Sequence, residues 1–191
     1  CKIYYQKNGQ LRIQCFFKDG ILYGECKLYY ETGQLLTRCF YNGKVQGFRF
    51  QDWISVSVYN FSNCGDLEGT YEKYYKNGHL MRNCFYNDGN KTGEYKGYYD
   101  DGQLERHCFY NDGITHGEHK QYYVSGQLFS QCFYKDGKKD GEYKRYYENG
   151  KLELHCFYKD DKQDGEYKRY YENGTLVIHC FYNDDKKELD S

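Results

Sequence analysis

The stretch GEYKRYYENGKLELHCFYKDDKQD, residues 141–164, decides the fold because close copies of it run along most of the chain. The copies align on a Cys followed by two aromatic residues, which occurs seven times. The five cysteines from Cys84 to Cys180 stand 24 residues apart. A fixed period of about 20 to 50 residues is typical of stacked, identical modules. Each recurring residue is therefore interpreted first as part of a repeated structure and only then as a candidate site.

Each copy predicts a β-hairpin. Residues 142–147 and 152–158 are rich in aromatic side chains, which favour strands. Asn149-Gly150 stands between them, and this dipeptide favours a two-residue type I′ turn. The later residues 159–165 are polar and are expected to form a longer connection to the next hairpin.

A two-residue turn would fix the pairing of the two strands. It would place Tyr147 opposite Leu152 and Tyr143 opposite Cys156, and side chains alternate between the faces of a sheet. One face is then expected to carry Tyr143, Tyr147, Leu152, Cys156 and Tyr158. The other face is expected to carry Glu142, Lys144, Glu153 and His155, joined by Tyr146 and Phe157.

The predicted fold class is all-β: a single antiparallel meander of repeated hairpins that forms an elongated, twisted or curved ribbon. Each module of such an array contacts only its neighbours. We expect one array of about eight modules, at residues 1–23, 24–46, 47–68, 69–92, 93–116, 117–140, 141–164 and 165–191. The module 47–68 is degenerate and holds the single Trp, Trp53. It is either a strand-forming remnant or a bend or partner-binding insertion.

The composition restricts the class of protein. Hydrophobic residues make up 39%, yet 26 Tyr and 12 Phe argue against disorder. The net charge of −1 argues against nucleic-acid binding, which needs a basic face. No apolar segment is long enough to span a membrane and no signal peptide is visible, so we expect a cytoplasmic rather than a secreted protein. The first residue, Cys1, falls inside the repeat pattern, so the chain is expected to be a fragment or a processed product.

Seven of the ten cysteines form a ladder with one member in most modules: Cys15, Cys39, Cys84, Cys108, Cys132, Cys156 and Cys180. Neighbouring modules lie two strands apart, roughly 9 to 10 Å, which is too far for a disulfide or for shared zinc ligands. The ladder is therefore expected to consist of buried, reduced thiols with a structural role. Of the remaining cysteines, Cys26 could pair with Cys39 and Cys1 with Cys15, while Cys64 has no expected partner.

No constellation predicts catalysis or a metal site. A Cys–His pair needs both side chains within hydrogen-bond reach, whereas His155 and Cys156 point to opposite faces. The Asp-Gly pairs, such as Asp88-Gly89, lack the spacing of a calcium loop and fit turns instead. We therefore expect no enzyme activity, no metal and no cofactor.

The repeated residues resemble the MORN repeat family, in its variant with a Tyr-Tyr-x-x-Gly-x-Leu core, best seen at residues 141–152 and 165–176. The resemblance covers roughly 170 of the 191 residues. It implies a hairpin array with no catalytic activity. Members include bacterial antitoxin-like proteins and eukaryotic scaffolds that tether membranes or partner proteins. The abundance of Asn, Lys, Tyr, Asp and Phe, without Ala or Pro, is similar to MORN-repeat proteins of large amoebal DNA viruses.

The expected function is a scaffold for protein–protein interaction, because contiguous apolar patches commonly mark interfaces. A structural virion or assembly component, a membrane-surface tether and an antitoxin-like protein are the alternatives. The expected partner surface consists of two aromatic rows on the face opposite the ladder: Tyr74, Tyr98, Tyr122, Tyr146 and Tyr170, with Phe85, Phe109, Phe133, Phe157 and Phe181. Self-association through the end strands is a further expectation, whereas the near-neutral charge predicts little membrane binding.

Overall fold

The computed structural model describes residues 1–43 and 67–188. Every regular element in this part of the chain is a β-strand, and all pairings are antiparallel. The predicted all-β hairpin meander is confirmed. The degenerate module 47–68 lies almost entirely outside the described residues, and so does Cys64.

The strands follow one another at short intervals. Their bounds are β1 Lys2–Tyr4, β2 Leu11–Gln14, β3 Phe17–Lys18, β4 Ile21–Tyr29, β5 Leu35–Asn42, β6 Gly69–Tyr74, β7 Leu80–Asn87, β8 Asn90–Tyr98, β9 Leu104–Asn111, β10 Ile114–Tyr122, β11 Leu128–Lys135, β12 Lys138–Tyr146, β13 Leu152–Lys159, β14 Lys162–Tyr170, β15 Leu176–Asn183 and β16 Lys186–Lys187.

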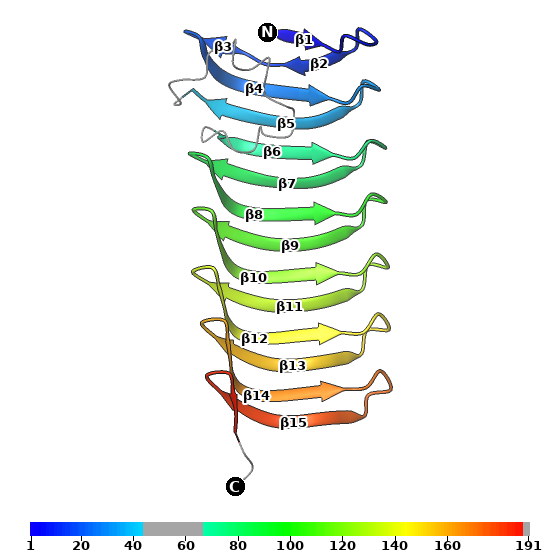
Figure 1. Cartoon of the computed structure of the whole chain (residues 1–191), viewed down its shortest axis with the longest axis vertical. Coiled ribbons are helices and arrows are strands. Elements are labelled where there is room, and N and C mark those ends of the chain that lie inside the picture. The colour runs from blue at the N-terminus through cyan, green and yellow to red at the C-terminus, as the bar shows by residue number, and fades with distance from the viewer. Residues whose placement is uncertain (44–66, 189–191) are drawn as a thin grey trace. The chain divides into compact units, whose positions relative to one another are not determined.

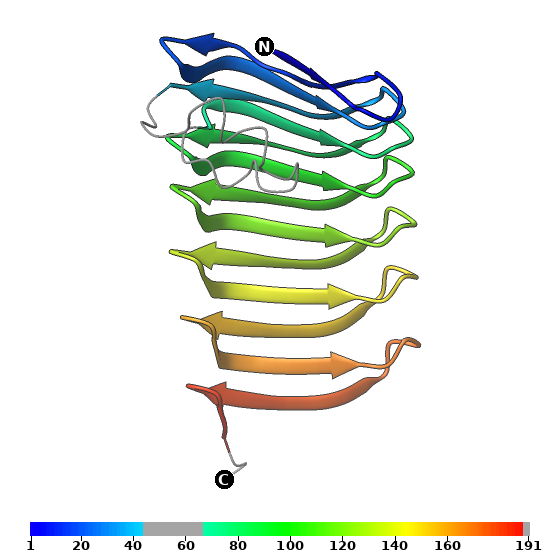
Figure 2. The ribbon, with the colours of Figure 1, turned by 45° about the horizontal axis from the view of Figure 1, so that its top comes forward.

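The chain divides into two units, which are described separately. Unit 1 comprises Cys1–Gly93 with Asp100–Gly102, and unit 2 comprises Glu94–Tyr99 with Gln103–Ser191. The strand order in unit 1 is β1-β2-β4-β5-β6-β7, with β3 paired to β4. Unit 2 continues from β8 in chain order to β16. Within each unit, the longer hairpin loops lie at one end of the strands and the tight turns lie at the other end (Figures 1 and 2).

The hairpin β12–β13 shows the pairing of a complete module. Tyr143 lies opposite Cys156, as predicted, and Arg145 lies opposite Leu154. The next pair is Tyr146 with Leu152, because a bulge leaves Glu153 as an extra residue on β13. The predicted pairing of Tyr147 with Leu152 is therefore wrong by one residue, since the Tyr147 N–H donates instead to the Lys151 carbonyl at 2.8 Å.

The loop at Asn149-Gly150 is not a type I′ turn, because only Gly150 has a positive φ, of 81°. The Gly150 N–H donates to the Tyr147 carbonyl at 2.9 Å, and the Asn149 side chain accepts the Lys151 N–H at 2.9 Å. This is the three-residue hairpin loop that ends in a left-handed Gly. Asn is favoured here because its side chain satisfies the loop backbone.

The connection after β13 is shorter than predicted. Lys159 pairs with Lys162, so only Asp160 and Asp161 form the turn, and both have positive φ, of 51° and 69°. Both central residues of a type I′ turn require this conformation. The polar residues expected in a loop belong instead to β14, which bulges near Gly165 at φ 112°.

The core is a thin layer on one face of the sheet. All of its cysteines are at most 5% exposed: Cys15, Cys26, Cys39, Cys84, Cys108, Cys132, Cys156 and Cys180. Aromatic pairs flank them, such as Tyr143 and Tyr158, whose ring centres lie 5.8 Å apart. We call this face the cysteine face and the other the outer face.

Candidate interaction surface

The outer face carries a repeated cluster of charged side chains. In β12–β13 the Glu142 carboxylate forms an ion pair with Lys144 and a hydrogen bond with His155, both at 2.8 Å. Lys144 and, to a lesser degree, His155 hold the pKa of Glu142 below its usual value. The same arrangement recurs at Glu94, Lys96 and His107 and at Glu166, Lys168 and His179. The outer face is thus an ordered polar surface rather than a continuous apolar one.

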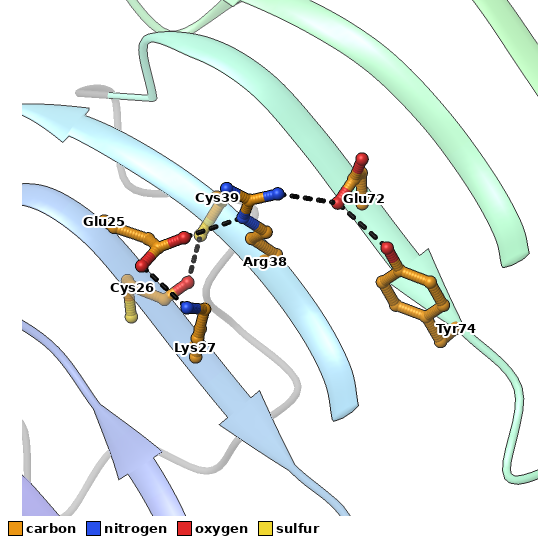
Figure 3. A network of polar contacts seen from close by, with 7 residues as sticks. All are labelled: Glu25, Cys26, Lys27, Arg38, Cys39, Glu72 and Tyr74. Atoms are coloured by element: carbon orange, nitrogen blue, oxygen red, sulfur yellow. Dashed lines mark hydrogen bonds and ion pairs between the residues drawn. The ribbon is translucent and has the colours of Figure 1, made fainter. Parts of the chain in front are cut away.

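Unit 1 has a variant of this cluster in which an Arg links two hairpins (Figure 3). Arg38 donates to Glu25 at 2.7 Å and also reaches Glu72, at 3.8 Å. Glu72 accepts a hydrogen bond from the Tyr74 hydroxyl at 2.9 Å. Burial, followed by the hydrogen bond with Glu72, raises the pKa of Tyr74 to about 12. This network joins β5 to β6 across the strand pair Arg38–Glu72.

The predicted Phe row lies on the outer face beside the charged clusters. Phe85, Phe133 and Phe181 are exposed, at 47%, 40% and 46%, whereas Phe109 and Phe157 are half-buried. The His155 ring stacks on Phe157 with 5.1 Å between ring centres, and the same contact recurs between His179 and Phe181. In the hairpins β8–β9, β12–β13 and β14–β15, one Phe therefore lies beside a His and a Glu–Lys ion pair.

The predicted Tyr row lies nearer the loops and is less accessible. Tyr74, Tyr98, Tyr122, Tyr146 and Tyr170 are all half-buried. Their backbone carbonyls also have a structural role, because a Tyr hydroxyl of the preceding hairpin donates to several of them. Tyr123 binds the Tyr146 carbonyl at 2.9 Å and Tyr147 binds that of Tyr170 at 2.8 Å.

Glu153 was expected on the outer face but is found on the cysteine face. The bulge in β13 turns its side chain toward Arg145, with which it makes two hydrogen bonds of 2.7 and 2.6 Å. The alternation of side chains along a strand cannot predict such a bulge, because the sequence has a period of two both before and after Glu153. The basic residues at the Arg145 position of three modules, Lys73, Arg145 and Arg169, were the available signal for a charged partner on the cysteine face, and the sequence reasoning missed it.

The nine cysteines within residues 1–43 and 67–188 are free thiols. Cys26 lies opposite Cys39, as predicted, and the Cys39 thiol contacts the Cys26 carbonyl at 3.9 Å. Cys1 and Cys15 exchange backbone hydrogen bonds of 2.7 and 3.0 Å, which makes them a second facing pair. The sequence reasoning missed that Cys26 also contacts Cys15, which lies in the preceding module.

Two features of the described residues bear on metal binding and on thiol chemistry. Residues 1–43 and 67–188 contain no group of three His, Cys, Asp or Glu side chains placed to hold a metal ion. Burial raises the pKa of the Cys156 thiol to about 11, so this thiol is a poor nucleophile at neutral pH. No helix in the described ranges is long and apolar enough to cross a bilayer.

The comparison with known families agrees with this geometry. A family model described as a MORN repeat variant matches six segments, residues 22–42, 67–88, 91–112, 115–136, 139–160 and 163–184. Most of these segments begin just after a tight turn and contain one hairpin. A search among curated proteins found no match for the chain. Since the six segments cover more than half of its length, the chain belongs to the MORN repeat family.

Proposed function

We propose that this protein is a non-enzymatic repeat scaffold that binds a protein partner through its outer face. The observation that carries the proposal is the exposure of Phe85, Phe133 and Phe181, each at least 40%, at the same place in its module. Exposed apolar patches commonly mark protein interfaces, and these rings recur on the same face of the sheet. The MORN repeat is a non-catalytic repeat type, which supports a binding function.

The charged clusters beside the Phe rings favour a protein partner over a membrane. The cluster of Glu142, Lys144 and His155 places both signs of charge close together. Mixed charges of this kind in the polar rim of a protein interface give specificity for one partner. An anionic membrane attracts clusters of Lys and Arg without intervening carboxylates. The repeated Glu of the outer face argues against that mode of binding.

The proposal can be tested by affinity purification from the native source with matched variants. The double variant F133S/F181S removes two exposed rings of the outer face. Y171S serves as the control, because Tyr171 is even more exposed, at 58%, but belongs to the cysteine face. We expect the same protein to be captured by the native chain and by Y171S and to be lost with F133S/F181S, with unchanged circular dichroism. Equal capture by both variants would exclude the outer face.

A further inference from the structure

Unit 1 has a cavity on its cysteine face, next to the longer hairpin loops, with a volume of about 670 Å³. Its walls include the rings of Tyr5, Tyr30 and Tyr71, and Leu28 contributes to the lining. Ligand sites for small molecules typically occupy about 300 to 1,000 Å³ and combine aromatic walls with a few polar groups. The size and the walls of this cavity fit that description.

The cavity is strongly basic although the whole chain has a net charge of −1. Four cationic side chains line it, Arg12, Lys73, Lys76 and Arg82, against a single carboxylate, Glu31. Such a concentration of one charge raises the local potential for an anion.

One of the four cations, Arg12, stands three residues before a ladder Cys, at a position of the module that varies along the chain. In the module 141–164 of unit 2 this position holds Glu153, which makes two hydrogen bonds of 2.7 and 2.6 Å with Arg145. In unit 1 the same position holds Arg12, Leu36 and Met81. In unit 1 this position thus supplies a cation or an apolar side chain, where the module 141–164 supplies a carboxylate.

Two of the cations, Arg12 and Lys73, are destabilised by burial or by a neighbouring positive charge, and a bound anion would stabilise them. The Arg12 Nε is buried without a hydrogen-bond partner among the described residues, and its guanidinium lies 5.6 Å from the centre of the Tyr5 ring. Lys73 faces Arg82 across the strand pair, and burial followed by the charge of Arg82 lowers the pKa of Lys73. A bound anion would offset both the desolvation and the repulsion.

We propose that this cavity binds a small organic anion, a phosphate or carboxylate carried on an aromatic body. The cations would hold the anionic group and the Tyr rings would pack on the flat part. The site lies on the opposite face from the proposed protein interface, so the two proposals stand independently.

Isothermal titration calorimetry of the full chain with phenyl phosphate tests the site, with phenol and inorganic phosphate as its two halves. We expect one site per chain, with phenyl phosphate bound at least about tenfold more tightly than either half. R12Q and K73Q should each weaken binding by about tenfold or more, as expected for loss of a charge-assisted contact. Arg169 occupies the position of Lys73 in a module of unit 2, so R169Q should leave binding unchanged. If R12Q fails to fold, K76Q replaces it, because Lys76 is exposed.

Several outcomes would overturn the inference. Absence of phenyl phosphate binding, equal weakening by R169Q, or equal affinity for phenol would each show that the cations of unit 1 do not form an anion site. Flotation with phosphatidylserine vesicles distinguishes a membrane from a soluble ligand. Vesicle binding that R12Q and K73Q abolish, without binding of phenyl phosphate, would assign the cavity to lipid headgroups and contradict the small-anion site.

Discussion

The Tyr147 hydroxyl donates a 2.8 Å hydrogen bond to the backbone carbonyl of Tyr170, in the next hairpin. The bond joins one module to the next at the end of the strands that carries the longer hairpin loops. Equivalent bonds join Tyr5 to Tyr29 and Tyr99 to Tyr122. The second Tyr of the Tyr-Tyr pair thus couples consecutive repeats, which in such arrays is the main source of cooperativity.

Replacing Tyr147 with Phe should destabilise unit 2 by about 1 kcal/mol, because a half-buried carbonyl loses its donor while the ring is retained. Urea unfolding followed by circular dichroism measures this change. Tyr171 is the matched control, since it occupies the same position in the last complete hairpin and makes no such bond within the described residues. Y171F should change the free energy of unfolding by less than about 0.3 kcal/mol. An equal effect of both substitutions would argue against the coupling role.

His119 should make unit 2 sensitive to mild acid. It replaces the Tyr found at this position in other modules and lies on the cysteine face between Cys108 and Cys132. Burial, followed by the charges of Arg106 and Lys139, lowers the pKa of His119 to about 4. A depressed pKa means that stability is present above the unfolded value, near 6.5, and is lost as the pH falls toward 4.

The test compares H119Y with the native chain at pH 7 and pH 4.5. The native chain should lose about 2 kcal/mol more than H119Y, after allowance for the partial exposure of the ring. Tyr should be tolerated because the neighbouring modules already pack it. H116Q is the control, since His116 is exposed, and it should retain the native pH dependence. Identical acid sensitivity of H119Y and the native chain would refute the assignment to His119.

The repeat period and the facing of Tyr143 and Cys156 were predictable because both follow from strand alternation over several residues. The turns were not. Asn149-Gly150 and Asp160-Asp161 both suit left-handed backbone, and the sequence does not show that Asn149 instead uses its side chain to bind the Lys151 N–H. Because the tight two-residue turn lies after β13, the polar residues that were predicted to form a loop there belong to β14 instead.

The candidate surfaces were predictable only in part. The outward direction of Phe133 follows from alternation, but the half-burial of Tyr146 depends on packing beside the loop. The basic cavity depends on a bulge that turns the position of Glu153 and Arg12 toward the cysteine face. A bulge is a backbone feature with no periodic signal, so strand alternation alone could not place these side chains on the cysteine face.

The ladder residue Cys156 should limit stability at alkaline pH. Burial raises the pKa of Cys156 from 9.0 to about 11, so the unfolded thiol ionises first. A raised folded pKa means that stability is complete below pH 9.0 and is lost as the pH rises toward 11. C156A should remove about 2 kcal/mol of the loss between pH 8.5 and 11, measured by urea unfolding under reducing conditions. C1A should keep the native slope because Cys1 is exposed, and a slope unchanged in C156A would contradict the prediction.

Asp161 should stabilise its tight turn in spite of its unfavourable backbone. It stands in the left-handed region at φ 69°, where most of the equivalent turns have Gly. Its Oδ1 accepts the Lys139 N–H at 2.7 Å, while its own N–H donates to the Lys139 carbonyl at 2.9 Å. D161A keeps the strained backbone and loses the side-chain bond, so it should cost about 2 kcal/mol. D161G relieves the strain as it loses the bond and should be neutral within about 0.5 kcal/mol. D161N retains an acceptor and should also be close to neutral. Urea midpoints rank the three variants, and a D161A protein as stable as D161N would show that the Lys139 contact does not stabilise the turn.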